Sequence, residues 1–175
     1  MTQKNHEIQA ISLTQKDYAA YGDVIAARSD VSPVSANMGT AARFNSLTKL
    51  ENLRPGKSEA NVCVYHCEPQ IVRPVDRFAV RVLERHFFST QTFVPMNASR
   101  YLVIVCLGKD RPDLSTLRAF LVSGTQGITY KPGVWHHPLV AMDKPTDFAC
   151  VVWENGTDGD CEVVDLVSPL MVSVS

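Results

Sequence analysis

The chain has 175 residues, of which 45% are hydrophobic and 20% are charged, and its formal net charge is −1. This composition is ordinary for a globular protein, and the near-neutral charge offers no electrostatic basis for binding nucleic acid or an anionic membrane. The longest apolar runs, such as residues 101–107, are too short to cross a bilayer. We therefore predict one domain over residues 1–175, with no nucleic-acid or membrane partner.

Two features favour a cytoplasmic location. The N-terminus, Met1 to Glu7, lacks the long apolar segment of a signal peptide. The five cysteines are irregularly spaced and odd in number, which argues against a disulfide framework and suits a reducing compartment. Cys106 and Cys150 lie in apolar runs, so we interpret them as small buried residues.

In chain order, the first predicted element is a short helix within residues 13–21. Thr14 can cap its first turn, Asp17 follows three residues later as in a capping box, and Gly22 stands where a helix commonly stops. The next segment, residues 30–39, is rich in Ser, Pro, Asn and Gly and predicts an irregular loop. Only a small helical appendage is expected.

From residue 60 onward, short strands separated by turn signals dominate, as in a sandwich or barrel. A polar link over residues 110–117 has room for one helical turn, and Asn155-Gly156 and Asp158-Gly159 are dipeptides typical of hairpins. We therefore expect a mainly β domain. Its candidate strands cover residues 62–67, 79–86, 91–95, 101–107, 117–121, 148–153 and 161–167.

Two polar segments in this β region carry the candidate chemistry, and the first contains Glu84 and His86. Side chains alternate along a strand, so these two lie on one face. Gln91 follows after a turn and can re-enter the same interior. Glu84 alone is more commonly a solvated residue, so the prediction depends on a second segment reaching the same interior.

The second segment, Gly127 to Pro138, places His136 and His137 after a turn that contains Gly and Pro. Such a turn is rigid, and an imidazole held on it can act as a base, an acid or a metal ligand near neutral pH. Only one of two adjacent residues on a strand faces inward. Tyr130 either hydrogen-bonds within a pocket or satisfies a buried edge, and Trp135 is interpreted as core or pocket wall.

Arginines become relevant if the ligand carries a carboxylate, because a guanidinium binds it with two parallel hydrogen bonds. The candidates are Arg43, Arg85 and Arg118. Arg118 is flanked by apolar residues in a predicted strand, where an arginine needs a partner or an exposed position.

The pattern Gly-x2-Tyr-x2-Gly-x2-His that ends at His136 resembles the second conserved motif of cupin barrels. Glu84-x-His86-x4-Gln91 resembles the first motif, with Glu84 in place of its first histidine and Gln91 in place of its glutamate. The resemblance favours His136 over His137 as the inward residue. It implies a mainly β, cupin-type double-stranded β-helix (jelly-roll) barrel with a short N-terminal helix.

The chain as a whole resembles the ureidoglycolate lyase family (also called ureidoglycolate hydrolase) within the cupin superfamily. The sequence departs from the family pattern at residues 152–156. Residues 38–47 match the family only loosely, through Arg43. The segments that carry it span most of the chain: LTQKDYAAYGDVI from Leu13, LERHFFSTQTFVPM from Leu83, PDLSTLRAF from Pro112 and QGITYKPGVWHHPL from Gln126.

This resemblance implies cleavage of (S)-ureidoglycolate to glyoxylate and urea in allantoin (purine) catabolism, by a homodimer. It suggests nickel if a divalent metal is used, although the donor types alone do not choose among nickel, zinc and manganese. Another cupin enzyme, or a cupin that binds a different small carboxylate, remains an alternative. The candidate catalytic residues are His86, His136 and Glu84. The candidates for substrate binding are Arg43, Arg118, Tyr130 and Gln91, and those for metal binding are His86, His136, Glu84 and Gln91.

Overall fold

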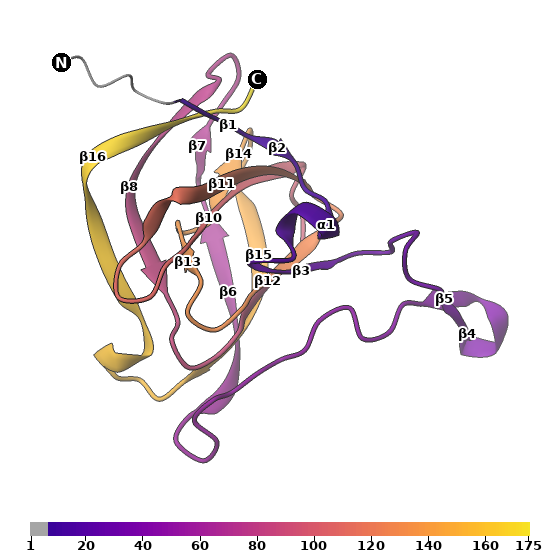
Figure 1. Ribbon diagram of the computed structural model, residues 1–175. Helices are drawn as coiled ribbons and strands as arrows, with labels where there is room; N and C mark the ends of the chain where they lie inside the picture. Colours follow the sequence, from indigo (N-terminus) through magenta and orange to yellow (C-terminus); the bar gives the residue numbers. More distant parts are fainter. Residues whose placement is uncertain (1–6) are drawn as a thin grey trace.

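The computed structural model describes residues 7–175. Figure 1 shows most strands wrapped into a barrel-like body, from which one slender arm projects. The prediction of a mainly β, barrel-like fold with one short N-terminal helix is confirmed. No helix among these residues is long and apolar enough to cross a membrane.

The body is built from two sheets. The five-stranded sheet has the order β3 (Gly22–Ile25), β12 (Gly127–Tyr130), β9 (Gln91–Pro95), β15 (Thr146–Glu154) and β6 (Glu59–Cys67). The nine-stranded sheet has the order β1 (Ile8–Gln9), β16 (Glu162–Ser173), β8 (Arg77–Arg85), β13 (Trp135–His136), β10 (Arg100–Leu107), β11 (Asp113–Ser123) and β2 (Ile11–Ser12), with β14 (Val140–Met142) beside β10 and β7 (Pro69–Ile71) beside β14.

Both short strands at the N-terminus join the nine-stranded sheet through parallel pairing. Strand β2 pairs with β11, and β1 pairs with β16, where Ile8 lies opposite Val172. The first and last strands of the described chain are therefore neighbours, as Figure 1 shows at the top of the barrel.

Two apolar cores lie on the two faces of the β10–β11 pair. The first lies toward the five-stranded sheet and includes Tyr101 and Phe148, and the second lies toward β8 and β16 and includes Leu102 and Trp135. Because neighbouring residues on a strand point to opposite faces, each strand of the pair contributes to both cores. The predicted burial of Trp135 is confirmed, as is that of Cys106 and Cys150.

Helix α1 spans Gln15–Tyr18, within the predicted range but shorter than it. Its cap is the predicted one, since the Thr14 hydroxyl accepts a hydrogen bond from the backbone N–H of Asp17 at 3.1 Å. Gly22 then has a role beyond ending the helix. A Cβ atom at this position would lie 1.6 Å from the carbonyl oxygen of Thr129, so only glycine lets β3 pair with β12.

Two connections differ from their predicted form. Residues 113–117 begin strand β11 instead of forming a helical turn: Asp113 pairs with Leu107 of β10, and the register shifts before the next pair, Arg118 and Val105. The Asn155-Gly156 and Asp158-Gly159 dipeptides do not close a hairpin, because the strands they connect, β15 and β16, belong to different sheets. The second dipeptide instead forms a 3-10 turn, η2 (Asp158–Asp160).

The segment predicted as an irregular loop forms most of the projecting arm, which comprises residues 33–43. Strands β4 (Val34–Ala36) and β5 (Ala41–Arg43) pair with each other and, within residues 7–175, with no other strand. A 3-10 turn, η1 (Asn37–Gly39), joins them. The segment contains no hydrophobic alternation, which explains why its strands are not visible in the sequence.

Candidate active site

The two predicted segments meet in register. Strand β13 bridges β8 and β10, so that His136 is paired with Glu84 on one side and with Val105 on the other. Directly opposed residues of neighbouring strands point to the same face. The Oε1 atom of Glu84 lies 3.5 Å from Nε2 of His136, an electrostatic contact longer than a strong hydrogen bond.

The Gly/Pro turn fixes this meeting through the backbone. Gly133 has φ +78°, a conformation that favours glycine, and its N–H donates to the carbonyl oxygen of His86 at 2.8 Å. The N–H of Val134 closes the same turn on the carbonyl oxygen of Lys131 at 3.2 Å. The turn that precedes His136 is therefore bonded directly to the residue that bears the other imidazole.

Five of the predicted site residues come together here: Glu84, His86, Gln91, Tyr130 and His136, hereafter the Glu84 cluster. The rings of His86 and His136 stack with their centroids 5.9 Å apart, and the Tyr130 ring stacks on His136 at 3.9 Å. Gln91 is the register partner of Tyr130 on the neighbouring strand, so their side chains share one face.

Within residues 7–175, four buried polar atoms of this cluster have no hydrogen-bond partner: Nδ1 of His86, Oε1 of Gln91, the Tyr130 hydroxyl and Nε2 of His136. Buried polar groups in folded proteins are nearly always satisfied, so unpaired ones at a single place indicate a ligand position. Nδ1 of His136 lies 2.9 Å from the carbonyl oxygen of Val134, which can only accept. Nδ1 therefore carries the hydrogen of the neutral ring, and Nε2 presents a lone pair to the cluster.

The pKa shifts in the cluster have opposite causes at His86 and at Glu84, and both groups titrate below their usual range. Burial lowers the pKa of His86, and the neighbouring His136 lowers it further against the opposing effect of Glu84. Burial by itself raises the pKa of Glu84, but the contact with His136 and the charge of the surrounding histidines outweigh it, so the net pKa is below the usual value. Burial raises the pKa of Tyr130 well above its ordinary value, so the phenol stays protonated.

Glu84, His86 and His136 form a largely buried group that could bind a metal ion, because their candidate ligand atoms all lie within 4.8 Å of one another. Two imidazoles and one carboxylate suit divalent transition metals. The hydrogen bond from His136 Nδ1 to a backbone carbonyl is also the arrangement that orients metal-bound histidines. Gln91, the fourth predicted donor, shares the face of its register partner Tyr130, and its role as a metal ligand stays a prediction.

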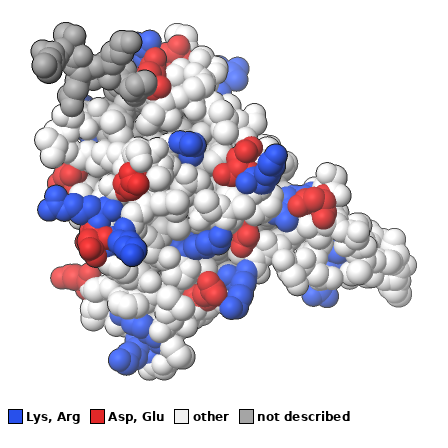
Figure 2. All heavy atoms as spheres, in the orientation of Figure 1, with Lys and Arg blue, Asp and Glu red and all other residues white. Residues whose placement is uncertain are grey.

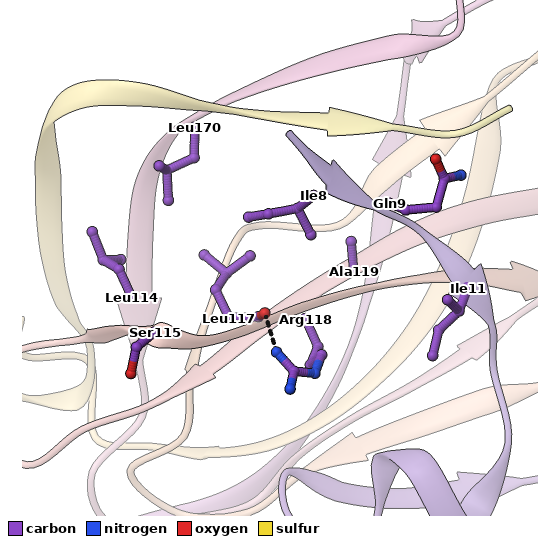
Figure 3. A pocket seen from close by; sticks show the side chains of 9 residues that line it. All are labelled: Ile8, Gln9, Ile11, Leu114, Ser115, Leu117, Arg118, Ala119 and Leu170. Carbon is purple, nitrogen blue, oxygen red and sulfur yellow. Dashed lines mark hydrogen bonds between the residues drawn. The ribbon is translucent and has the colours of Figure 1, made fainter. Parts of the chain in front are cut away.

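The arginines predicted to bind substrate lie elsewhere in the single chain. Arg43 is on the arm, which Figure 1 shows standing clear of the barrel. Arg118 lines a groove of about 580 Å³ between β1, β11 and β16, where its guanidinium donates to the carbonyl oxygen of Leu117 at 3.0 Å (Figure 3). The third candidate, Arg85, points away from Glu84, pairs with Glu162 at 2.6 Å and stacks over the Trp135 ring.

No pattern in the sequence predicts the acidic surroundings of the Glu84 cluster. The charge of Glu154 acts on the pKa of His86, and that of Glu84 acts on the pKa of Cys161. Both Glu154 and Cys161 line a cavity of about 440 Å³ together with Asp158 and Asp160. Glu154 ends strand β15 and the other three follow it, with no spacing that links them to the histidine motifs, so only the fold brings them near.

His137, the second residue of the histidine pair, has structural contacts. Its Nδ1 lies 2.7 Å from the carbonyl oxygen of Pro138, and its ring packs edge-on against Phe78 at 5.1 Å. Burial lowers its pKa, which favours the neutral ring. The geometry therefore fits the expectation that His136, and not His137, faces the cluster.

Comparison with known proteins places this site in a family. The family model described as "Ureidoglycolate lyase" matches residues 5–173. Ureidoglycolate lyases of Salmonella typhimurium (strain LT2) and Salmonella enteritidis PT4 are each 40% identical over 157 residues, which covers 90% of this chain and 92% of the relative.

Two solved structures were also compared. A dTDP sugar isomerase from Desulfovibrio desulfuricans G20 has a TM-score of 0.45 at 16% identity, over 81% of this chain and 83% of the other. RmlC from Streptococcus suis in complex with dTDP-D-xylose has a TM-score of 0.39 at 9% identity, over 59% of this chain and 47% of the other. The family model and the Salmonella sequences decide the assignment: the chain belongs to the ureidoglycolate lyase family of carbon–nitrogen lyases.

Proposed function

We propose that the Glu84 cluster is the active site at which this chain cleaves (S)-ureidoglycolate to glyoxylate and urea. The observation that carries this proposal is the set of four unpaired buried polar atoms beside an ionised carboxylate. The reaction needs few groups. The substrate hydroxyl loses a proton, a C=O bond forms as the C–N bond breaks, and the departing urea nitrogen takes up a proton. No water is consumed, so the step is an elimination.

The imidazole of His136 is the proposed base. Its Nδ1 hydrogen is committed to Val134, so Nε2 is free to take the hydroxyl proton and then to return it to the leaving nitrogen. Glu84, 3.5 Å from Nε2, stabilises the imidazolium that forms in between. His86, whose Nδ1 is also unpaired, is the second candidate for the same role.

Gln91 and Tyr130 are proposed to orient the substrate. The unpaired Oε1 of Gln91 suits an N–H donor of the ureido group, and the protonated Tyr130 hydroxyl suits a substrate oxygen. Neither atom has a partner in the described protein, so neither needs to break a bond within the fold when substrate enters. The two residues are register partners, which holds their spacing constant.

The cluster is also proposed to bind a divalent ion, held by Glu84, His86 and His136. The family resemblance suggests nickel, and the donor set also accepts zinc or manganese. A bound ion would supply positive charge for the substrate carboxylate and for the developing oxyanion. The ion and a free imidazole base compete for the same lone pairs, so metal removal distinguishes the two routes.

The test is release of glyoxylate from (S)-ureidoglycolate, followed with a coupled reductase, on protein whose metal content is measured before and after chelation. We expect turnover in the wild type and its loss in His86→Ala and His136→Ala. His66→Ala is the matched control, because His66 is 63% exposed and pairs with Asp147 outside the cluster. Wild-type turnover in both site variants would overturn the assignment. Binding without turnover would favour the small-molecule-binding alternative.

We further propose that residues 1–175 form one domain that works in the cytoplasm as a homodimer. The five cysteines are all free, which suits a reducing compartment. Of the N-terminal segment on which the location was also predicted, residues 1–6 lie outside the described residues. The homodimer is what the family resemblance implies.

A further inference from the structure

Two cysteines face each other across strands β6 and β15. Cys63 and Cys150 are register partners on these antiparallel strands, so their side chains leave the sheet on the same face. Cys150 belongs to the first apolar core, and Cys63 packs against that core. Both thiols are free. The reaction proposed at the Glu84 cluster uses neither of them.

The backbone spacing of such a pair suits a disulfide. Directly opposed residues of an antiparallel pair have Cα atoms about 4.5 or 5.5 Å apart, and both spacings lie within the range of about 4.4–6.8 Å found in disulfides. The Cβ atoms of opposed residues are about 4.5–5.5 Å apart, whereas a disulfide needs about 3.5–4.5 Å. An approach of about 1 Å is therefore enough to bring the two sulfur atoms into bonding geometry.

The two side chains already interact. Burial is the largest cause that raises the pKa of the Cys150 thiol, and the next causes are the charge of Cys63 and a hydrogen bond with its side chain. A thiol is only a weak donor and acceptor, so this interaction requires the two sulfur atoms to be neighbours. Strand β6 is the edge of its sheet and, among the described residues, pairs with β15 alone, so the approach breaks no other strand pairing.

The two thiols differ in their access to solvent. Cys63 is half-buried, whereas the exposed fraction of Cys150 is 0%. Tyr65, the next residue on the same face of β6, is 40% exposed, so the core is open along this edge. Burial also keeps the Cys150 thiol protonated, and a protonated thiol is a poor nucleophile. An oxidant therefore reacts first at Cys63.

The other three cysteines have no comparable partner in the described chain. Cys67 lies four residues after Cys63 on the same strand, which places it about 13 Å away. Cys106 belongs to the second core, and Cys161 lines the acidic cavity near Glu154. The pair across β6 and β15 is thus the one that the strand register places for a direct bond.

We infer that Cys63 and Cys150 form a reversible disulfide when the protein meets a peroxide. The Cys63 thiolate attacks the peroxide, an S–O bond forms as the O–O bond breaks, and the departing hydroxide takes up a proton and leaves as water. The Cys150 sulfur then attacks the Cys63 sulfur, loses its proton and displaces the hydroxyl group as a second water. Two electrons pass from the two thiols to the peroxide, and exchange with a dithiol restores both thiols.

A small neutral oxidant such as hydrogen peroxide suits this protein. Figure 2 shows basic and acidic side chains interspersed over one face of the molecule, so that face has no patch of one sign to concentrate a charged reagent. Disulfides in a reducing compartment are usually transient and redox-sensing, which matches a free thiol pair at a sheet edge. The inference is independent of the reaction at the Glu84 cluster.

The test exposes the purified wild type to a small excess of hydrogen peroxide, alkylates the remaining thiols and maps the disulfides by peptide mass spectrometry. We expect the loss of two of the five thiols, one peptide pair that joins Cys63 to Cys150, and recovery of both thiols after dithiothreitol. The bond closes a loop that runs from residue 63 to residue 150, so the thermal midpoint of the oxidised protein should rise by about 5–15 °C.

Cys67→Ser is the matched control, because Cys67 is also half-buried on β6 and has Thr146 as its register partner. This variant should form the disulfide as the wild type does, whereas Cys63→Ser and Cys150→Ala should not form it. Cys63 is half-buried, so Cys63→Ser keeps the fold and the comparison does not depend on the buried position.

Three results would overturn the inference. In the first, the wild type keeps all five thiols or joins a different pair of cysteines. In the second, Cys63 is oxidised to sulfinic acid without bonding to Cys150, which shows that the buried thiol does not reach it. In the third, the disulfide lowers the thermal midpoint, which shows that the bond distorts the native register instead of fitting it.

Discussion

Replacing Glu84 with glutamine removes one negative charge from the cluster and keeps the shape of the side chain. Glu84 Oε1 lies 3.5 Å from His136 Nε2, the atom proposed to carry a positive charge during the reaction. At an effective dielectric constant of 20, Coulomb's law gives about 5 kcal/mol for two unit charges at this separation. The Glu84 side chain is 23% exposed, so solvent reduces this value to about 2–3 kcal/mol. The loss corresponds to a fall in kcat of about 100-fold.

The assay is the initial rate of glyoxylate release at saturating substrate, measured for the wild type and for Glu84→Gln. The matched control is Glu68→Gln, because Glu68 is 75% exposed and pairs only with the exposed His66. Circular dichroism and the thermal midpoint should be similar for all three proteins. A kcat for Glu84→Gln within about 3-fold of the wild-type value, which corresponds to less than 1 kcal/mol, would refute the electrostatic role of Glu84.

Three further predictions concern single contacts. Tyr130→Phe should leave the thermal midpoint nearly unchanged, because the hydroxyl has no partner in the described protein. The same variant should lower kcat/KM about 10-fold, and an unchanged kcat/KM would show that Tyr130 does not contact the substrate. Gly22→Ala should lower the free energy of unfolding by about 3 kcal/mol or more, because its Cβ would lie 1.6 Å from a backbone oxygen. Gly159→Ala, whose Cβ would have its nearest neighbour at 3.6 Å, should lower it only slightly, and equal denaturant midpoints for the two variants would contradict the prediction. Asp147→Asn should lower the pKa of His66 toward its ordinary value, because a 2.6 Å hydrogen bond to Asp147 raises this pKa in the wild type. An NMR titration of His66 measures the change, and a pKa that stays high in the variant would contradict the assigned cause.

The local parts of the site could be predicted from sequence because they depend on alternation and turn chemistry. Period-two alternation placed Glu84 and His86 on one face, and the Gly/Pro turn marked where His136 enters. The predicted strand 91–95 has the observed bounds of β9 for the same reason. These features are set by residues a few positions apart.

The remainder depends on which strands become neighbours. Arg118 lies in the same row of paired residues as His136, but Val105 of β10 stands between them. Two strand spacings separate the backbones of Arg118 and His136 by roughly 10 Å, and the residues near either position do not predict this distance. The acidic surroundings at Glu154 could not be predicted for a similar reason, because the pairing of β15 with β6, where Glu154 lies opposite Glu59, decides where that residue lies.

The pairing of β1 with β16 has a consequence for how the protein is made. Ile8 finds its strand partner, Val172, only after all the residues between them have left the ribosome. Until then the second core lacks β16, and the apolar face that carries Leu102 and Ile104 is uncovered. Synthesis at about 5–20 residues per second leaves this face exposed for several seconds. The second core is therefore closed only after β16 has been synthesised, and chaperones that bind exposed apolar strands have their opportunity during that interval.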